Sequence, residues 1–186
     1  MWTGLDTALG TIFPLMNGRK LSVQATAVDS GFNVDQVIKF VHSQRRKSRT
    51  TYAVKGMGGF DRMPLARGGR LKGQMQLLVV GVDTVKHSVQ KHLAMQEIGA
   101  GFIRLPDHLG PEYFDGLASE ELRVRYVKGA PRHEYHRTYR HNEPLDCLVY
   151  ATAIAKMVKI QAIAAPAHPG PSIKELAAKL AATTQQ

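Results

Sequence analysis

The chain has 186 residues, enough for one compact domain with a hydrophobic core. Lysine and arginine number 25 against 15 aspartate and glutamate residues, so the formal net charge is +10 and the pI is near 9.9. Such a balance favours a polyanionic partner, either nucleic acid or an acidic membrane surface. The single cysteine, Cys147, excludes an internal disulfide framework and fits a reducing compartment.

Neither a membrane span nor an export signal is predicted. No apolar run reaches the roughly 18 residues that a membrane-spanning helix needs. The opening stretch, MWTGLDTALGTIFPLMNG, carries Asp6 and no basic residue before its apolar residues, which is not the pattern of a signal peptide. We therefore expect a cytoplasmic protein with no membrane partner.

The first predicted elements are a strand and a helix with an acid between them. LSVQATAVD (21–29) alternates and then becomes continuously apolar, as a buried strand does, and Asp29 stands at its end. SGF then turns the chain, and Asn33 can cap the helix that follows. In VDQVIKFVHS the apolar residues recur at helical intervals, which predicts an amphipathic helix.

A second strand and helix follow a basic, glycine-rich segment. After the short strand TYAV, residues 55–73 cannot bury enough apolar surface to hold a fixed shape, so we expect a mobile loop that contacts phosphates. QLLVVGVD then reads as a strand ending in Asp83. TVKHSVQKHLAM reads as an amphipathic helix capped by Asp83 or Thr84.

The rest of the chain continues this alternation. GFIRLP (101–106) is predicted to be a short strand, PEYFDGLASEEL a helix, RVRYVKG and HEYHRTY a hairpin, and Glu143 to about Ile163 a long helix. AAPAHPGP then breaks the chain, and Ser172 with Glu175 forms a capping box for a last Ala-rich helix. We expect one domain over 1–163, with 164–186 as a linker and an appended helix. Alternating strands and helices predict an α/β fold with parallel pairing.

The segment RHNEPLDCLVYA places two carboxylates at the start of an apolar helix. Glu143 and Asp146 are three residues apart and share one helical face. The simpler interpretation is that both acids complement the positive end of the helix dipole. It does not account for the apolar neighbours of Asp146, because an acid on a buried face needs a cation or a metal.

Asp29 supplies another carboxylate, at the carboxyl end of a predicted parallel strand, where ligands gather in open α/β sheets. Oxygen ligands alone select Mg²⁺ or Mn²⁺ over zinc. Carboxylates clustered in a basic protein suggest metal-assisted attack on phosphodiesters. Asp83 is a further candidate ligand, although capping of its helix explains it equally well.

The segment HEYHRTYRH raises a zinc site as an alternative, through His133, His136 and His141. Structural zinc sites usually show recognisable Cys and His spacing, and no partner cysteine is present here. An arm that contacts phosphates is the favoured interpretation.

Six segments, taken in order, resemble the nuclease domain of the large terminase subunit of lambda-like tailed bacteriophages: AVDSG, YAVKGMGG, LLVVGVDTVK, FIRLPDHL, RYVKGAPRHEY and RHNEPLDCLVYA. The resemblance extends to about Ile163. It implies a ribonuclease-H-like mixed sheet flanked by helices. It also implies an endonuclease of the bacterial host cytoplasm that cuts concatemeric viral DNA with Mg²⁺ or Mn²⁺. Double-stranded DNA, the terminase small subunit and the portal are the implied partners.

The resemblance also implies roles for single residues. Asp29 and Asp146 match acids of the family's catalytic and metal site, and Glu143 matches the acidic position one turn before Asp146. Asp83 stays a further candidate for the metal. The expected DNA contacts are Lys55, Arg62, Arg67, Arg70, Lys72, Arg132, Arg137 and Arg140.

Two departures from the family pattern matter. Family members carry a first acid on a strand that would precede this chain, and no GxxxxGK[ST] motif of a packaging ATPase occurs. We therefore expect a sheet that is incomplete at its N-terminal strands, with one edge of 21–28 uncovered. That edge should recruit a second copy of the chain or the N-terminal residues Trp2, Leu5, Ile12 and Phe13. An active endonuclease, an inactive DNA-binding remnant of prophage origin and a structural interaction protein stay open.

Overall fold

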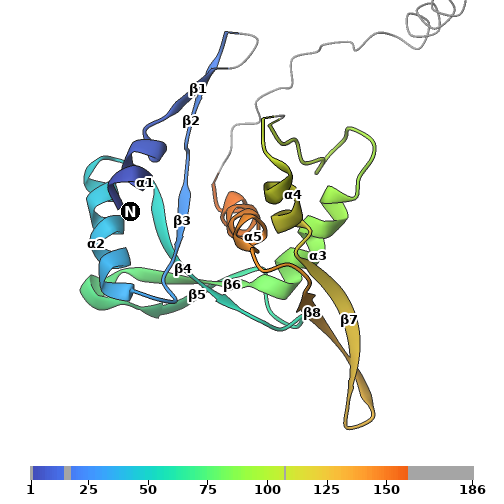
Figure 1. Cartoon of the computed structure of the whole chain (residues 1–186). Helices are drawn as coiled ribbons and strands as arrows, with labels where there is room; N and C mark the ends of the chain where they lie inside the picture. The colour runs from blue at the N-terminus through green and yellow to red at the C-terminus, as the bar shows by residue number, and fades with distance from the viewer. Residues whose placement is uncertain (1, 15–17, 107, 159–186) are drawn as a thin grey trace, which may run out of the picture.

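A computed structural model describes residues 2–14, 18–106 and 108–158 of the chain (Figure 1). Helices and strands alternate along it, as the α/β prediction requires. The elements are α1 (Trp2–Leu9), β1 (Ile12–Pro14), β2 (Lys20–Ser22), β3 (Thr26–Asp29), α2 (Val34–Arg46), β4 (Thr51–Met57), β5 (Leu65–Arg70), the 3-10 turn η1 (Lys72–Gln74), β6 (Gln76–Gly81), α3 (Val82–Leu93), α4 (Pro111–Leu117), β7 (Glu120–Val127), β8 (Ala130–Arg137) and α5 (Glu143–Ala155).

The central sheet of the described residues is mixed and has four strands in the order β3-β4-β6-β5. β3, β4 and β6 run parallel, and β5 pairs antiparallel with β6. Helix α2 provides the crossover from β3 to β4, which is the connection that parallel neighbours need. The mixed sheet and its flanking helices confirm the predicted α/β class and are consistent with a small ribonuclease-H-like sheet.

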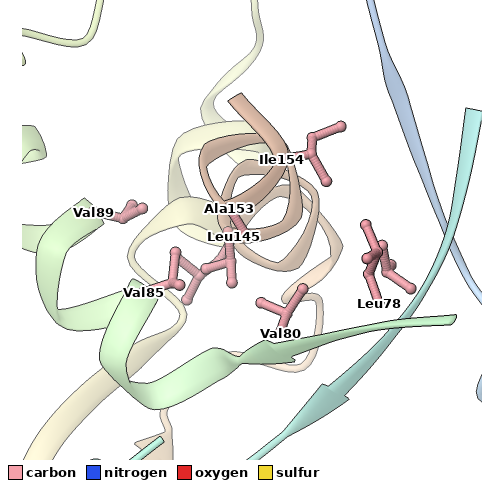
Figure 2. Close-up of a cluster of buried hydrophobic side chains, with 9 residues drawn as sticks. Leu78, Val80, Val85, Val89, Leu145, Ala153 and Ile154 are labelled. Atoms are coloured by element: carbon pink, nitrogen blue, oxygen red, sulfur yellow. The ribbon is translucent and has the colours of Figure 1, made fainter. Parts of the chain in front are cut away.

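Helices cover both faces of this sheet. Successive residues of a strand point to opposite faces, so each strand contributes to two layers. Val54 of β4 and Val80 of β6 pack with α3 and α5, and Figure 2 shows Leu145 of α5 among these side chains. Val28 of β3 and Ala53 of β4 pack on the other face with α2. The site-bearing helix α5 is therefore anchored directly on the sheet.

Helix α1 packs on α2. The Trp2 ring stacks on Phe40 with centroids 4.7 Å apart, and Leu5 joins the same cluster. The Asp6 carboxylate accepts hydrogen bonds from Lys47 Nζ at 2.7 Å and Arg49 Nη1 at 2.9 Å. Trp2 and Leu5 pack against the apolar cluster that contains Val28 of β3, as the expected covering of an apolar face requires. As part of helix α1 they do not pair with the edge of the sheet, so that part of the expectation is wrong.

The predicted strand 21–29 consists of two strands. In β2, Leu21 pairs with Phe13 of β1, so its edge is occupied within the chain. In β3, the described residues pair with β4 on one side, and β3 lies at the sheet edge, which confirms an unpaired edge for Thr26–Asp29. Ile12 and Phe13 are 58% and 50% exposed in the β1–β2 hairpin and do not cover that edge.

The prediction of a loop over 55–73 is wrong for much of that segment. β4 extends to Met57, and β5 runs from Leu65 to Arg70 along β6. A Cβ at Gly68 would lie 2.9 Å from Val79 Cγ2, so the absent side chain permits this close pairing. Glycine is unfavourable in a strand interior in general, but here the ladder to β6 stabilises the strand.

Three later predictions need correction. Residues 101–106 form no strand in the structure. The predicted helix PEYFDGLASEEL ends as α4 at Leu117, because Glu120 already begins β7. Helix α5 ends at Ala155, so the prediction that it continues is wrong for residues 156–158, which form a turn and a bend. The rest of its predicted course to Ile163, like the linker and helix over 164–186 with Ser172 and Glu175, lies outside the described residues.

The predicted hairpin is confirmed as β7 and β8. Its turn residues Lys128 and Gly129 both have positive φ, 51° and 80°, as a two-residue hairpin turn requires. Figure 1 shows this hairpin extending away from the sheet and helices. Among the described helices, none combines the length and the apolar character that crossing a bilayer would demand.

Candidate functional site

Asp29 and Asp146 line one pocket of about 470 Å³ between the free edge of β3 and helix α5. Asp29 is the last residue of β3 and pairs in register with Val54, whose side chain faces α5. Helix α5 presents Glu143, Asp146 and, one turn further, Tyr150 to the same pocket. The structure therefore brings together the three acids that the sequence singled out as catalytic.

The helical period explains why α5 carries acids and core residues side by side. Leu145, Val149 and Ala153 recur every four residues and are fully buried against the sheet and α3. Asp146 lies on the neighbouring face, with 42% of its side chain exposed. Leu145 and Val149 thus point into the core while Asp146 faces the pocket, which answers the difficulty that these apolar neighbours raised.

The pKa of Asp146 is raised above its usual range. Burial is the main cause, and the nearby carboxylates of Glu120 and Asp29 raise the pKa further. The cations of Lys86 and Arg137 act in the opposite direction. The carboxyl therefore lies among charges of both signs, a feature of functional sites.

A hydrogen-bonded network holds Asp146 in this position. Its Oδ2 accepts a hydrogen bond from Asn142 Nδ2 at 2.9 Å, and its Oδ1 lies 3.8 Å from Lys86 Nζ. Lys86 Nζ also donates to Glu120 Oε2 at 2.7 Å, and Asn142 Nδ2 donates to Glu120 Oε1 at 3.1 Å. The sequence prediction missed Lys86, Glu120 and Asn142. A lysine next to Val85 and Val89 on an amphipathic helix was the available signal, because a cation there needs a partner.

The other two acids of the pocket are more exposed. Asp29 Oδ1 accepts a hydrogen bond from the backbone N–H of Gly31 at 3.1 Å, a local turn that fixes the carboxylate after the strand. Glu143 has 73% of its side chain exposed, and its Oε2 lies 3.8 Å from His141 Nδ1. Glu143 is therefore the least constrained of the three.

Asp83 is placed elsewhere. Its Oδ2 accepts a hydrogen bond from the backbone N–H of Gly59 at 2.6 Å, which ties the β4–β5 connection to α3. It is not among the described residues that line the pocket of Asp29 and Asp146. The alternative of a cap by Asp83 or Thr84 is wrong, because α3 begins after Gly81 with no side-chain cap.

The fit of these acids to a divalent metal is partial. Carboxylate oxygens are the ligands that Mg²⁺ and Mn²⁺ prefer. Within residues 2–14, 18–106 and 108–158, however, no group of three or more His, Cys, Asp or Glu side chains lies close enough together to hold a metal ion. The same statement covers the histidines of the zinc alternative. Asp29 and Asp146 thus supply the chemistry of such a site but not a complete set of ligands.

The eight candidate DNA contacts are exposed but spread over several surfaces. Arg67 and Arg70 lie on β5, at the sheet edge opposite β3, and Lys72 shares a shallow pocket with residues of α2. Lys55 is the exposed residue of β4 that follows buried Val54, and Arg62 lies in the connection from β4 to β5. Arg132 and Arg137 are on β8, and Arg140 lies between β8 and α5. Arg140 is the candidate nearest to Asp146 in sequence, and Arg137 acts on Asp146 electrostatically.

The β7–β8 hairpin has two chemically different faces. Cross-strand pairs on one face are apolar or aromatic except for Glu120 with Arg137 at the base, and the pairs in the middle of the other face are charged. Tyr135 stacks on Phe60 at 5.6 Å near the base, whereas Tyr126 near the tip is 72% exposed. The apolar face pairs Leu122 with Tyr135, Val124 with His133 and Tyr126 with Pro131, and the charged face pairs Arg123 with Glu134 and Arg125 with Arg132.

Tyr150 is a pocket residue that the sequence prediction missed. Burial raises its pKa to about 12, and Asp29 and Asp146 add to the effect, so the phenol stays protonated at neutral pH. A Cβ at Gly56 would lie 2.7 Å from Tyr150 Oη and 2.9 Å from Val82 Cγ1. Glycine at position 56 therefore leaves room for the phenol beside the acids.

Gly56→Ala is expected to lower the free energy of unfolding by about 1–3 kcal/mol, because the added methyl group overpacks the contact with Tyr150 and Val82. Urea denaturation measures this. The matched control is Gly69→Ala on β5, where a Cβ meets open space. Equal stability changes in the two variants would mean that the packing around Gly56 is looser than the structure indicates.

Comparison with known proteins identifies a family that matches this chain. The family described as "Terminase large subunit gpA, endonuclease domain" matches residues 1–166. The terminase large subunit of Enterobacteria phage P21 is 30% identical over 200 aligned positions, covering 95% of this chain and 30% of the relative. That of Escherichia phage lambda is 25% identical over 166 residues, covering 82% of this chain and 25% of the relative.

The chain thus spans between a quarter and a third of the length of these relatives. No solved structure matches it.

Proposed function

The chain belongs to the family of terminase large-subunit endonuclease domains, and from this membership we propose that it is a metal-dependent endodeoxyribonuclease that cuts concatemeric viral DNA. The observation that carries the proposal is the shared pocket of Asp29 and Asp146 at the carboxyl end of a parallel strand. Carboxylates at such a strand end can act together on one substrate group.

We assign the binding of Mg²⁺ or Mn²⁺ to Asp29 and Asp146, with Glu143 as the more mobile third acid. When bound, such an ion lowers the pKa of a water molecule and stabilises the leaving oxygen of a phosphodiester. The chain's own contacts place these acids: Asn142 donates a hydrogen bond to Asp146, and the backbone N–H of Gly31 donates one to Asp29. We leave Asp83 out of this group because its carboxylate is bonded to Gly59.

Double-stranded DNA is the proposed substrate, and the charged face of the β7–β8 hairpin is the proposed guide toward the pocket. Arg137 lies at the base of the hairpin on its other face and acts electrostatically on Asp146, so the base of the hairpin and the acids lie within reach of one substrate. A two-stranded ribbon has the width that the major groove admits. The terminase small subunit and the portal are proposed partners, and the bacterial host cytoplasm is the proposed location.

Incubating the chain with supercoiled plasmid and Mn²⁺ tests the proposal. We expect nicked and linear DNA in the presence of Mn²⁺ and intact plasmid when EDTA is added. DNA binding without nicking would instead support the second candidate function, an inactive DNA-binding remnant. The position of Asp83 favours that alternative, because this candidate ligand is not among the described residues that line the pocket.

Neutralising basic residues is expected to flatten the salt dependence of DNA binding. Removing one phosphate contact should reduce the slope of log K against log salt by about 0.9. Fluorescence anisotropy with a labelled duplex measures this for two sets of glutamine substitutions. The sets are Arg132, Arg137 and Arg140, on and after β8, and Arg62, Arg67, Arg70 and Lys72, on and beside β5.

A control with glutamine at Arg45 and Arg46, at the end of α2, corrects for net charge. If a set changes the slope no more than this control does, its residues do not contact phosphates. Self-association through the free edge of β3 also stays a prediction, which light scattering at rising protein concentration addresses.

A further inference from the structure

We propose that Lys86 is a positioning residue: held by Glu120, it fixes the carboxylate of Asp146 on the wall of the pocket. The role of Asp146 in cleavage rests on the proposed function. The contacts of its side chain with Lys86 and Asn142 are observed whether or not the chain cleaves DNA.

Lys86 forms a buried ion pair with Glu120. Its side chain and that of Glu120 are 9% and 7% exposed, and Nζ and Oε2 lie 2.7 Å apart. Two charges removed from water need close partners, since an unpaired buried charge is strongly destabilising. The carboxylate of Glu120 also accepts from Asn142, and its backbone carbonyl accepts from Gln90 Nε2 at 3.1 Å. Hydrogen bonds to its side chain and its backbone therefore fix Glu120, and the carboxylate of Glu120 in turn fixes the ammonium group of Lys86.

The two oxygens of Asp146 face two different nitrogens of this network. Lys86 Nζ lies 3.8 Å from Oδ1, and Asn142 Nδ2 donates to Oδ2 at 2.9 Å. Both nitrogens are bonded to Glu120, so the two carboxylates and the two donors form a closed ring. A hydrogen bond to Oδ2 and a cation beside Oδ1 together favour one orientation of the carboxylate. Its exposed side still faces the pocket, where further lone pairs remain available.

A purely structural role for the ion pair is the competing explanation. Lys86 lies on α3 and Glu120 begins β7, so the pair joins these two elements whatever Asp146 does. An ion pair that only joins α3 to β7 does not need the Lys86 nitrogen to lie near Asp146. The two explanations differ in whether removal of the pair disturbs Asp146 in a chain that stays folded.

The test uses the whole chain with both charges removed, as Lys86→Met/Glu120→Gln. Lys86→Met by itself leaves a buried carboxylate without its cation and can unfold the protein. In the double variant the amide oxygen at position 120 can still accept from Asn142. The readout is the pair of Asn142 side-chain amide signals in ¹H–¹⁵N NMR spectra, identified by their loss in Asn142→Ala. Because Asn142 also donates to Glu120, Glu120→Gln alone gives the signal change caused by that acceptor. Asp146→Asn gives the change when the acceptor at position 146 is altered.

We expect the double variant to stay folded and to shift the Asn142 signals beyond those of Glu120→Gln alone, toward those of Asp146→Asn. Lys86→Arg should retain signals close to those of the unmodified chain. In the nicking assay, kcat should fall about tenfold with KM for DNA unchanged, since misplacement of a reacting group costs rate and not binding. Asn142 signals in the double variant that equal those of Glu120→Gln alone would overturn the proposal. A chain that never nicks DNA contradicts the proposed function alone, because the NMR result still decides the positioning role.

Discussion

Asp146→Asn is expected to abolish Mn²⁺-dependent nicking, with kcat falling by about 100-fold or more. Loss of an outer-shell partner of a metal ligand already costs about 10- to 100-fold in affinity or activity, so loss of a ligand should cost at least as much. Asparagine keeps the shape and the contact with Asn142 but removes the negative charge that faces the pocket. Initial rates of plasmid nicking, read from agarose gels, measure the effect.

The variant should stay folded, which separates loss of activity from loss of structure. Burial raises the pKa of Asp146 in the folded state, so the carboxyl favours folding when protonated. That contribution is present below the unfolded pKa and disappears as the pH rises through the folded value. A neutral asparagine avoids this loss, so Asp146→Asn should be at least as stable as the unmodified chain at neutral pH.

Asp35→Asn is the matched control, because Asp35 is exposed in the first turn of α2, away from the pocket. It should nick DNA at the unmodified rate. If Asp146→Asn nicked DNA as fast as this control, Asp146 would have no part in the reaction.

Leu145→Ala is expected to reduce the free energy of unfolding by about 2–5 kcal/mol, the range for removing a fully buried leucine. Leu145 has 0% exposure and packs with Val80 of β6 and Val85 of α3 (Figure 2). Its loss leaves a cavity where α5 meets the sheet, one residue before Asp146. Urea denaturation followed by circular dichroism measures the change.

Leu122→Ala on β7 is the control for the same chemical change at a surface position, since Leu122 is 38% exposed. Its cost should be less than half of that at Leu145. Similar costs at the two positions would mean that α5 is not anchored through Leu145.

The sequence by itself determined the elements whose patterns are local. The helical spacing of apolar residues after Asn33 predicted α2, and Asn33 does accept a hydrogen bond from Gln36 N at 3.3 Å. Alternation predicted the β7–β8 hairpin. The position of Asp29 at a strand end, and of Glu143 and Asp146 on one helical face, followed from periods of 2 and 3.6 residues. These local rules were enough to find the acids of the pocket.

Only the tertiary structure decided which distant groups meet. Lys86 and Glu120 are 34 residues apart, and no local pattern pairs them. Pairing with β6 makes a strand of the glycine-rich 65–70 segment, and bonding to Gly59 draws Asp83 away from the other acids. The physical reason is the same in each case. Backbone periodicity acts over a few residues, whereas the free energy of a buried ion pair or a strand ladder depends on partners that folding brings together.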